Sequence, residues 1–232
     1  MDIDFIERVY PMDDIRDALL SSREAFNRMM SVSDAVDDPG VVNAISYIYP
    51  KLRFAWLSMQ RYEFASRFLR ANDFVLDVPC GTGYGSAILA SNGNRVHGMD
   101  IDEASVSYAQ DRYKYPNLSF GTGDMTLCDL PNVDFITCLD GLEHVSDGRS
   151  LIERFVAALS EVGILVVSVP INELEITGGQ HNPYHMAEYT PESLKELLSR
   201  YFRRVSLFGH DLSGAISSID NAFDGITAVC EV

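Results

Sequence analysis

The sequence predicts an α/β fold built on a doubly wound, mainly parallel sheet of seven strands, with the last strand antiparallel. Three observations lead to this prediction. From residue 74 onward, short β-rich runs alternate with helical segments. The runs are apolar at nearly every position, as expected for strands that helices cover on both faces. The last two runs follow each other without a helix between them, which indicates an antiparallel return at the end of the chain.

Each element follows from its own residues. Runs rich in β-branched and aromatic residues predict strands at 74–78, 95–100, 118–121, 134–139, 163–169, 204–209 and 226–232. Helical segments between them predict helices at 83–90, 103–113 and 147–159. A further helix is expected to begin after Thr190 as N-cap, with Pro191 in its first position, and to run to about Tyr201. In such a sheet the ligand crevice lies beyond the carboxyl ends of the strands, so we expect the functional residues there.

Residues 1–70 differ from the rest of the chain. Apolar residues have helical spacing at 13–30 and again from about 51 to 69, and the turn signal Asp37-Asp38-Pro39-Gly40 separates the two segments. We expect residues 1–70 to form a helical cap over one edge of a core domain that spans residues 71–232.

The composition argues against several classes of partner. Asp and Glu outnumber Lys and Arg by 34 to 18, so the formal net charge is −16. Such a chain repels nucleic-acid backbones and anionic membrane surfaces, and its apolar runs are too short to span a bilayer. The four cysteines form no CxxC pair, which is typical of the reducing cytoplasm. We therefore expect a cytoplasmic protein that acts on a small molecule, either as a monomer or as a homodimer.

A glycine-rich turn follows the first predicted strand. The strand ends near Asp77, and the segment Pro79-Cys80-Gly81-Thr82-Gly83-Tyr84 leads into the first helix. Glycines let the backbone bend sharply and approach a ligand closely. A dinucleotide-binding fingerprint would need a further glycine where Ser86 stands, so an NAD-dependent oxidoreductase is the weaker alternative.

Acidic residues also end the next two strands. Asp100 closes the second strand, with Ile101 beside it, and an ionised carboxylate there can accept hydrogen bonds from both ribose hydroxyls. Asp124 and Met125 follow the third strand, where the acid can accept from an exocyclic amine and the methionine can pack on an adenine face. Each acid alone is an ordinary surface residue, but their positions at successive strand ends indicate a nucleoside site.

These segments resemble the cofactor site of class I S-adenosylmethionine-dependent methyltransferases. The resemblance rests on VLDVPCGTGYGSAILA, VHGMDIDEASVSYAQ and FGTGDM. It implies a Rossmann-like fold and S-adenosylmethionine as cofactor, with the turn holding the methionine part and the acids holding ribose and adenine. The residues it assigns to the cofactor are Asp77, Pro79, Gly81, Gly83, Tyr84, Asp100, Ile101, Asp124, Met125 and Asp140. Pro79 departs from the family, which usually has Gly or Ala there, and a proline cannot donate a backbone N–H.

The loop after the fourth strand is the expected chemical site. It contains Asp140-Gly141-Leu142-Glu143-His144, and in the family that it resembles this loop faces the reactive methyl group and the acceptor. Methyl transfer requires that the acceptor be aligned and its proton removed. Because imidazole exchanges its proton near neutral pH, His144 is a candidate base, with Glu143 beside it. A purely structural histidine is the alternative.

The same loop is similar to the E-x-x-E-H loop of ubiquinone-biosynthesis O-methyltransferases, where such residues bind a divalent cation. Here Asp140 replaces the first Glu. A cation held by Asp140, Glu143 and His144 would clamp an acceptor with neighbouring oxygens. We favour the alternative, a hydrogen-bonded loop without a metal.

A third cluster, His181-Asn182-Pro183-Tyr184-His185, precedes the last predicted helix. His185 is a second candidate for contacting the acceptor or acting as the base, and a loop held by its own hydrogen bonds is the alternative. The string NPYHMAEYTPESLKELLSRYF resembles methyltransferases linked to bacterial polysaccharide and sugar modification, as does RYEFASRFL.

The expected function is therefore methyl transfer from S-adenosylmethionine to a small-molecule or carbohydrate acceptor, at oxygen. Methylation of an amino-sugar or another small amine is an alternative, because it would use the same cofactor motifs. A non-catalytic S-adenosylmethionine-binding protein is another, because it would keep the pocket without the transfer.

Overall fold

The computed structural model describes residues 58–171, 182–211, 215–223 and 225–232. Within this part, the residues from Met59 to Val232 form one compact unit. The cap expected for residues 1–70 falls mostly on residues 1–57, which lie outside the described residues, so the cap and its boundary stay predictions. Residues 59–66 are helical, which agrees with the helix expected from about 51 to 69.

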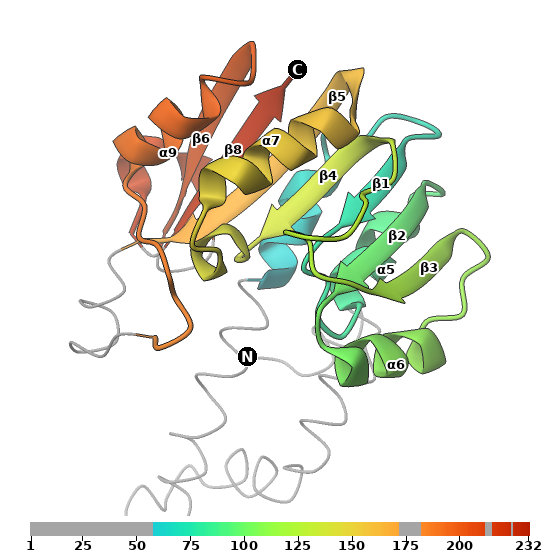
Figure 1. Ribbon diagram of the computed structural model, residues 1–232. Helices are drawn as coiled ribbons and strands as arrows, with labels where there is room; N and C mark the ends of the chain where they lie inside the picture. Colours follow the sequence, from blue (N-terminus) through green and yellow to red (C-terminus); the bar gives the residue numbers. More distant parts are fainter. Residues whose placement is uncertain (1–57, 172–181, 212–214, 224) are drawn as a thin grey trace, which may run out of the picture. The chain divides into compact units, whose positions relative to one another are not determined.

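An eight-stranded sheet carries the fold, in the order β3-β2-β1-β4-β5-β8-β6-β7 (Figure 1). Strands β1 to β5 are parallel to one another, and β8 lies antiparallel between β5 and β6. This arrangement confirms the doubly wound, mainly parallel sheet and its antiparallel last strand. The strands are β1 (Phe74–Asp77), β2 (Arg95–Asp100), β3 (Leu118–Thr122), β4 (Val133–Leu139), β5 (Leu159–Pro170), β6 (Arg204–His210), β7 (Ile216–Ser218) and β8 (Gly225–Glu231).

The sheet has one strand more than the seven that the sequence predicts. Strand β7 pairs antiparallel with the outer edge of β6. It is only three residues long and its side chains are exposed or half-buried, so it lacks the apolar run that marks the other strands. Strand β5 is also longer than its apolar segment, because it begins at Leu159 and includes the exposed residues Glu161 and Val162.

The helices between the strands agree with the prediction. They are α5 (Tyr84–Ala90), α6 (Glu103–Arg112), α7 (Gly148–Ala158) and α9 (Pro191–Leu198), with short 3-10 turns η1 (Leu142–His144) and η2 (Ile219–Asn221). Asp102, Asp147 and Thr190 cap α6, α7 and α9 by accepting backbone N–H groups at 3.0, 3.0 and 3.2 Å. Helix α9 ends at Leu198, earlier than the expected end near Tyr201. The described segment 123–132, between β3 and β4, contains no helix.

Within the described residues, no helix has both the length and the apolar character that crossing a bilayer requires.

Neighbouring side chains of β1 and of β5 belong to two separate core clusters. Leu76 and Val167 belong to the core that includes α7 and α9, whereas their neighbours Val75 and Val166 belong to the core that includes α5 and the helical residues 59–66. This alternation follows from the two-residue period of a strand. Helices therefore cover both faces of the sheet, with α7 and α9 on one face and α5 on the other (Figure 1).

The topology concentrates the expected functional residues at one edge of the sheet. Because β1, β2, β3 and β4 are parallel, their carboxyl ends lie at the same edge. Strands β2 and β4 flank β1 on opposite sides, so the strand order reverses beside β1. Ligand crevices of open α/β sheets form at such reversal points. The loops that leave these four strands carry the acids and glycines singled out in the sequence.

The packing of α7 on the sheet provides a test of the core. Phe155 is fully buried in the cluster between α7 and the sheet. We expect Phe155→Ala to lower the free energy of unfolding of the full chain by about 3–5 kcal/mol, because it leaves a cavity in a packed core. Urea unfolding followed by circular dichroism measures this change. The control Val162→Ala, at a side chain that is 65% exposed, should change the same free energy by less than about 0.5 kcal/mol. Equal losses for the two variants would contradict the packing described.

Candidate active site

The carboxylate of Asp77 lies beneath the site and joins three elements. Its Oδ1 accepts hydrogen bonds from the Tyr62 hydroxyl at 3.1 Å and the Thr137 hydroxyl at 2.8 Å, and its Oδ2 accepts from the Ser86 hydroxyl at 2.6 Å. These partners come from the helical residues before β1, from β4 and from α5. Asp77 is fully buried. It was expected to contact the cofactor, and the structure places it behind the turn as an anchor.

Burial dominates the electrostatics of this carboxylate. Desolvation raises the pKa of Asp77 from 3.8 to about 6, although the hydroxyls of Ser86, Thr137 and Tyr62 pull the pKa the other way. The charge of Asp100 adds a further, smaller increase to the same pKa. At neutral pH the ionised carboxylate therefore carries a desolvation free energy, which the three hydrogen bonds that it accepts reduce.

The glycine turn bends through backbone conformations that suit glycine. Gly81 and Gly83 have φ values of +53° and +85°, in the left-handed region where a Cβ atom is strained. A Cβ at Gly83 would also lie 2.6 Å from that of Ala109 on α6. The Gly81 N–H donates to Asp100 Oδ2 at 2.7 Å, so the turn is fixed against the end of β2.

The packing of α5 explains why Ser86 can stand where a dinucleotide-binding fingerprint would have glycine. The close approach of α5 to Tyr62 occurs at Gly85, where a Cβ atom would lie 2.0 Å from the Tyr62 ring. The Ser86 side chain donates a hydrogen bond to Asp77. Tyr84, another expected cofactor residue, packs edge-on against Tyr62 with ring centroids 5.5 Å apart.

Asp100 presents its carboxylate at the end of β2 in a fixed orientation. One oxygen accepts from the Gly81 N–H, as described, and the other accepts from the Asp102 N–H at 2.9 Å. The residue is 8% exposed, whereas Ile101 beside it is 69% exposed. A buried acid next to an exposed apolar side chain is suited to a ribose and the adjoining base.

Asp124 forms a compact turn after β3. Its Oδ1 accepts from both the Thr126 hydroxyl at 2.6 Å and the Thr126 N–H at 2.8 Å. These hydrogen bonds hold the pKa of Asp124 below its ordinary value. The turn is joined to the end of β2, because the Gly123 N–H donates to the carbonyl of Asp100 at 2.8 Å.

A cavity of about 390 Å³ lies among these loops. Six of the residues expected at the site line it: Pro79, Asp100, Ile101, Asp124, Met125 and His144. The expected site residues that do not line it are Asp77, Gly81, Gly83, Tyr84, Asp140, Glu143 and His185. Sequence reasoning missed Thr126, Val145, Ser146 and Met186, which also line the cavity. Thr126 and Val145 directly follow expected residues in the loops after β3 and β4, and that adjacency was the available signal.

The side chain of Asp140 is held away from the expected metal ligands. It forms an ion pair with the buried guanidinium of Arg61 at 2.7 Å and accepts from the Ser168 hydroxyl at 2.9 Å. Arg61 also donates to Nδ1 of His210 at 3.3 Å. Burial, and then the charge of Arg61, lower the pKa of His210 to about 3, so this imidazole is neutral and can accept that bond.

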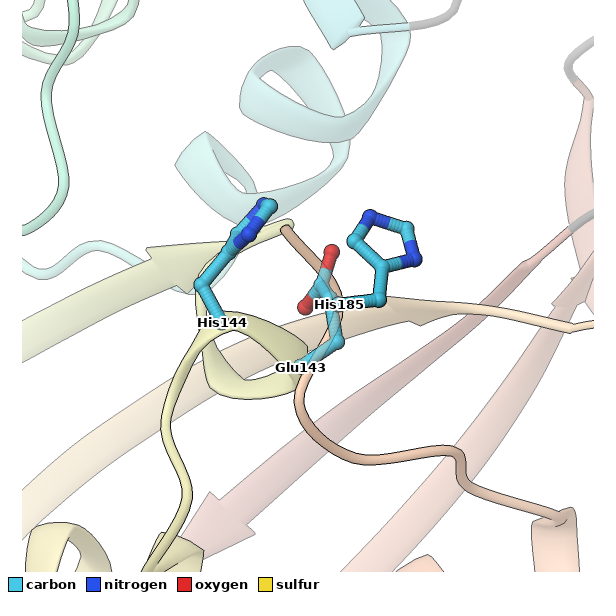
Figure 2. Close-up of side chains that lie close together, drawn as sticks. All are labelled: Glu143, His144 and His185. Carbon is cyan, nitrogen blue, oxygen red and sulfur yellow. The ribbon is translucent and has the colours of Figure 1, made fainter. Parts of the chain in front are cut away.

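Glu143 and His144 instead meet His185. Figure 2 shows the Glu143 carboxylate between the two imidazoles, with His185 contributed by the loop before α9. One candidate ligand atom from each residue lies within 4.8 Å of the others, and the ring centroids of His144 and His185 are 4.8 Å apart. The Glu143 carbonyl fixes this loop by accepting from the N–H groups of Met186 and Ala187 at 2.7 and 3.1 Å. His181, from the same predicted cluster, lies outside the described residues.

The hydrogen bonds of the two imidazoles define which nitrogen carries the proton. Nδ1 of His144 lies 3.0 Å from the Tyr184 carbonyl, which can only accept, so Nδ1–H donates and Nε2 keeps its lone pair. The Asn182 amide is oriented by the Tyr184 N–H, which donates to Asn182 Oδ1 at 3.0 Å. Its NH₂ group therefore donates to Nε2 of His185 at 2.9 Å. The cluster thus offers an imidazole lone pair at His144, whereas the Nε2 lone pair of His185 is already used.

This pattern is suited to proton transfer more than to a cation bound by all three residues. Coordination by His185 would require its bond with Asn182 to break or the amide to turn away from the Tyr184 N–H. The lone pair at His144 Nε2 needs no such change, and His144 lines the cavity.

The raised pKa of Asp77 predicts a specific dependence of stability on pH. Because the carboxyl group binds its proton more tightly in the folded protein, its contribution to stability is complete below about pH 4 and is lost as the pH rises through about 6. The change from 3.8 to about 6 corresponds to roughly 3 kcal/mol. We therefore expect the free energy of unfolding of the wild type, minus that of Asp77→Asn, to fall by this amount between about pH 4 and 7. Urea titrations across this range measure it, and a difference independent of pH would contradict the assignment.

Comparisons with known proteins match part of this chain to methyltransferases. Residues 75–163 match the family model described as "Methyltransferase domain". A Mycolicibacterium smegmatis protein named "Probable S-adenosylmethionine-dependent methyltransferase" is 33% identical over 129 residues, which cover 53% of this chain and 49% of that protein. A Coxiella burnetii ubiquinone biosynthesis O-methyltransferase is 34% identical over 98 residues, 40% of this chain and 42% of that protein. The chain thus spans about half the length, or less, of these curated relatives.

Solved structures show the same fold at low sequence identity. An S-adenosylmethionine-dependent methyltransferase from Archaeoglobus fulgidus superposes with a TM-score of 0.62 at 17% identity, covering 78% of this chain and 94% of its own. One from Clostridium acetobutylicum gives 0.62 at 14% identity, covering 82% and 98%. Residues 75–163 thus match a methyltransferase domain, and the likenesses to solved structures show that this chain shares the fold of S-adenosylmethionine-dependent methyltransferases.

Proposed function

We propose that the protein transfers a methyl group from S-adenosylmethionine to a hydroxyl group of a small-molecule or carbohydrate acceptor. One observation carries the proposal. The cavity is lined on one part by strand-end residues suited to a nucleoside, Asp100 and Asp124, and on another by His144, whose Nε2 has a lone pair. Its volume of about 390 Å³ lies in the range of small-molecule sites.

The cofactor end of the cavity fits S-adenosylmethionine by the chemistry of its donor set. The Asp100 carboxylate can accept from the ribose hydroxyls, and Ile101 and Met125 offer apolar contacts to the adenine. Asp124 has one carboxylate oxygen bonded to Thr126, which leaves the other oxygen to accept from the adenine amine. When bound, S-adenosylmethionine supplies a methyl group on a sulfonium, whose sulfur keeps the bonding electrons when the methyl passes to the acceptor.

At the other end, the cluster of Glu143, His144 and His185 receives the acceptor proton in this proposal. The Tyr184 carbonyl holds the His144 ring in the tautomer whose Nε2 can accept a proton. Glu143 is 2% exposed, and a buried carboxylate close to an imidazole stabilises the imidazolium that forms. His185 supports the loop that carries the Tyr184 carbonyl.

Two considerations favour an oxygen acceptor of small size. A general base is needed to remove the proton from a hydroxyl during transfer, whereas a neutral amine needs none, and the described tautomer of His144 supplies such a base. A net charge of −16 disfavours polyanionic acceptors such as nucleic acids.

All four cysteines are free thiols, which supports a cytoplasmic setting.

The role of Asp100 predicts a loss of cofactor affinity. We expect Asp100→Asn to weaken binding of S-adenosylmethionine by about 10- to 100-fold, because hydrogen bonds to a charged acceptor contribute about 1.5–3 kcal/mol. Isothermal titration calorimetry measures this. The matched control Asp102→Asn changes the acid two residues along the chain and keeps a good N-cap for α6, so it should bind within about twofold of the wild type. Equal effects at the two positions would oppose the ribose contact.

The role of His144 predicts a loss of turnover without a loss of cofactor. We expect His144→Gln to lower the rate of methyl transfer by about 10²- to 10⁴-fold, the usual contribution of a general base, while the S-adenosylmethionine Kd stays within about twofold. Transfer of a radiolabelled methyl group to a panel of small hydroxyl compounds, sugars first, measures the rate. The control is His97→Gln, on β2 and paired with Ser119. A variant at position 144 that keeps the full rate on a hydroxyl acceptor would contradict the role of His144 as the base.

A further inference from the structure

The loop after β3 carries Asp124 and Met125 without support from a helix of its own. The described segment 123–132 contains no helix. It folds as a single turn, in which the carbonyl of Asp124 accepts from the N–H groups of Leu127 at 3.0 Å and Cys128 at 2.8 Å. Leu127 is 77% exposed, so the turn gains little from packing on that side. A short exposed turn needs other contacts to keep one geometry.

The side chain of Arg154 supplies such contacts from α7. Its Nε donates to the Met125 carbonyl at 3.1 Å, and its Nη2 donates to the Cys128 carbonyl. The guanidinium thus binds two carbonyls of the turn at once, as basic groups do at helix C-termini. The backbone of Arg154 is itself fixed, because Leu151 and Phe155 on the same helix are buried in the core.

We propose that Arg154 is a positioning residue that holds Asp124 where it recognises the adenine amine. The inference rests on the proposed function, in which Asp124 contacts the adenine. Arg154 does not line the cavity, so it acts through the turn and not by touching the cofactor. Since Thr126 occupies Oδ1 of Asp124, recognition depends on where the turn directs Oδ2.

The same geometry predicts selectivity between an amine and a keto group on the purine. An adenine presents a donor to the carboxylate, whereas the corresponding hypoxanthine presents an oxygen, which the carboxylate repels. A site built to bond one group rejects the analogue that leaves its polar atoms unpaired. This discrimination is sharp only while the carboxylate is held in place. Releasing the turn should therefore reduce selectivity as well as affinity.

The test is calorimetric titration of the full chain with S-adenosylhomocysteine and, separately, with its inosine analogue. We expect the wild type to prefer the adenosine compound by at least about tenfold. Arg154→Met should weaken binding of S-adenosylhomocysteine by about 5- to 50-fold and reduce the preference to within about threefold. Arg154→Lys should recover part of the preference, because an ammonium group can donate to one of the two carbonyls.

Arg149 provides the matched control on the same helix. It is exposed and bonds to Glu153 and Tyr201, away from the loop. Arg149→Met should leave both affinities and their ratio unchanged within about twofold. The positioning role would be overturned if the ratio of the two ligand affinities stayed at the wild-type value in both Arg154 variants. This holds even if both affinities fell, because general destabilisation weakens the binding of both ligands equally. If the wild type bound neither ligand, the proposed function would fail, and this inference with it.

Discussion

The buried Asp77 carboxylate is the constraint on which the geometry of the site depends. It lies at the end of β1, beside the point where the strand order reverses, and it bonds to Tyr62, Ser86 and Thr137. These residues belong to three elements that meet behind the glycine turn. A buried charge is costly unless donors surround it, so the interaction permits few other arrangements of these elements. The turn, and through Gly81 the Asp100 carboxylate, are positioned by it.

Two polar networks lie beside the cavity. In one, the ends of β2 and β3 are joined through Asp100 and the Gly123 N–H. In the other, Glu143 holds the loop before α9 through its carbonyl, and the Tyr184 carbonyl of that loop bonds to His144. Arg61 connects Asp140, through an ion pair, to His210, through a hydrogen bond. Asp100 and His144 are therefore oriented by backbone groups, which restrict them more than flexible side chains would.

The sequence predicted what is local and missed what depends on distant contacts. The strands, the Thr190 cap and the strand-end acids Asp100 and Asp124 follow from patterns within a few residues. The partners of Asp140 and His144 could not be predicted, because Arg61 is 79 residues from Asp140 and Tyr184 is 40 residues from His144. Asp77 was recognised as a residue of the site, but its burial depends on the packing of Tyr62 and Thr137. The edge strand β7 escaped prediction because its three residues have no apolar pattern.

The most direct measurement of the central claim is a crystal structure of the full chain with S-adenosylhomocysteine. The account predicts the ligand in the cavity at the ends of β1 to β4, with its ribose hydroxyls on the Asp100 carboxylate and its amine on Asp124. The sulfur should face the His144 side of the cavity. A ligand bound elsewhere, or an adenine outside the space between Ile101 and Met125, would contradict the account.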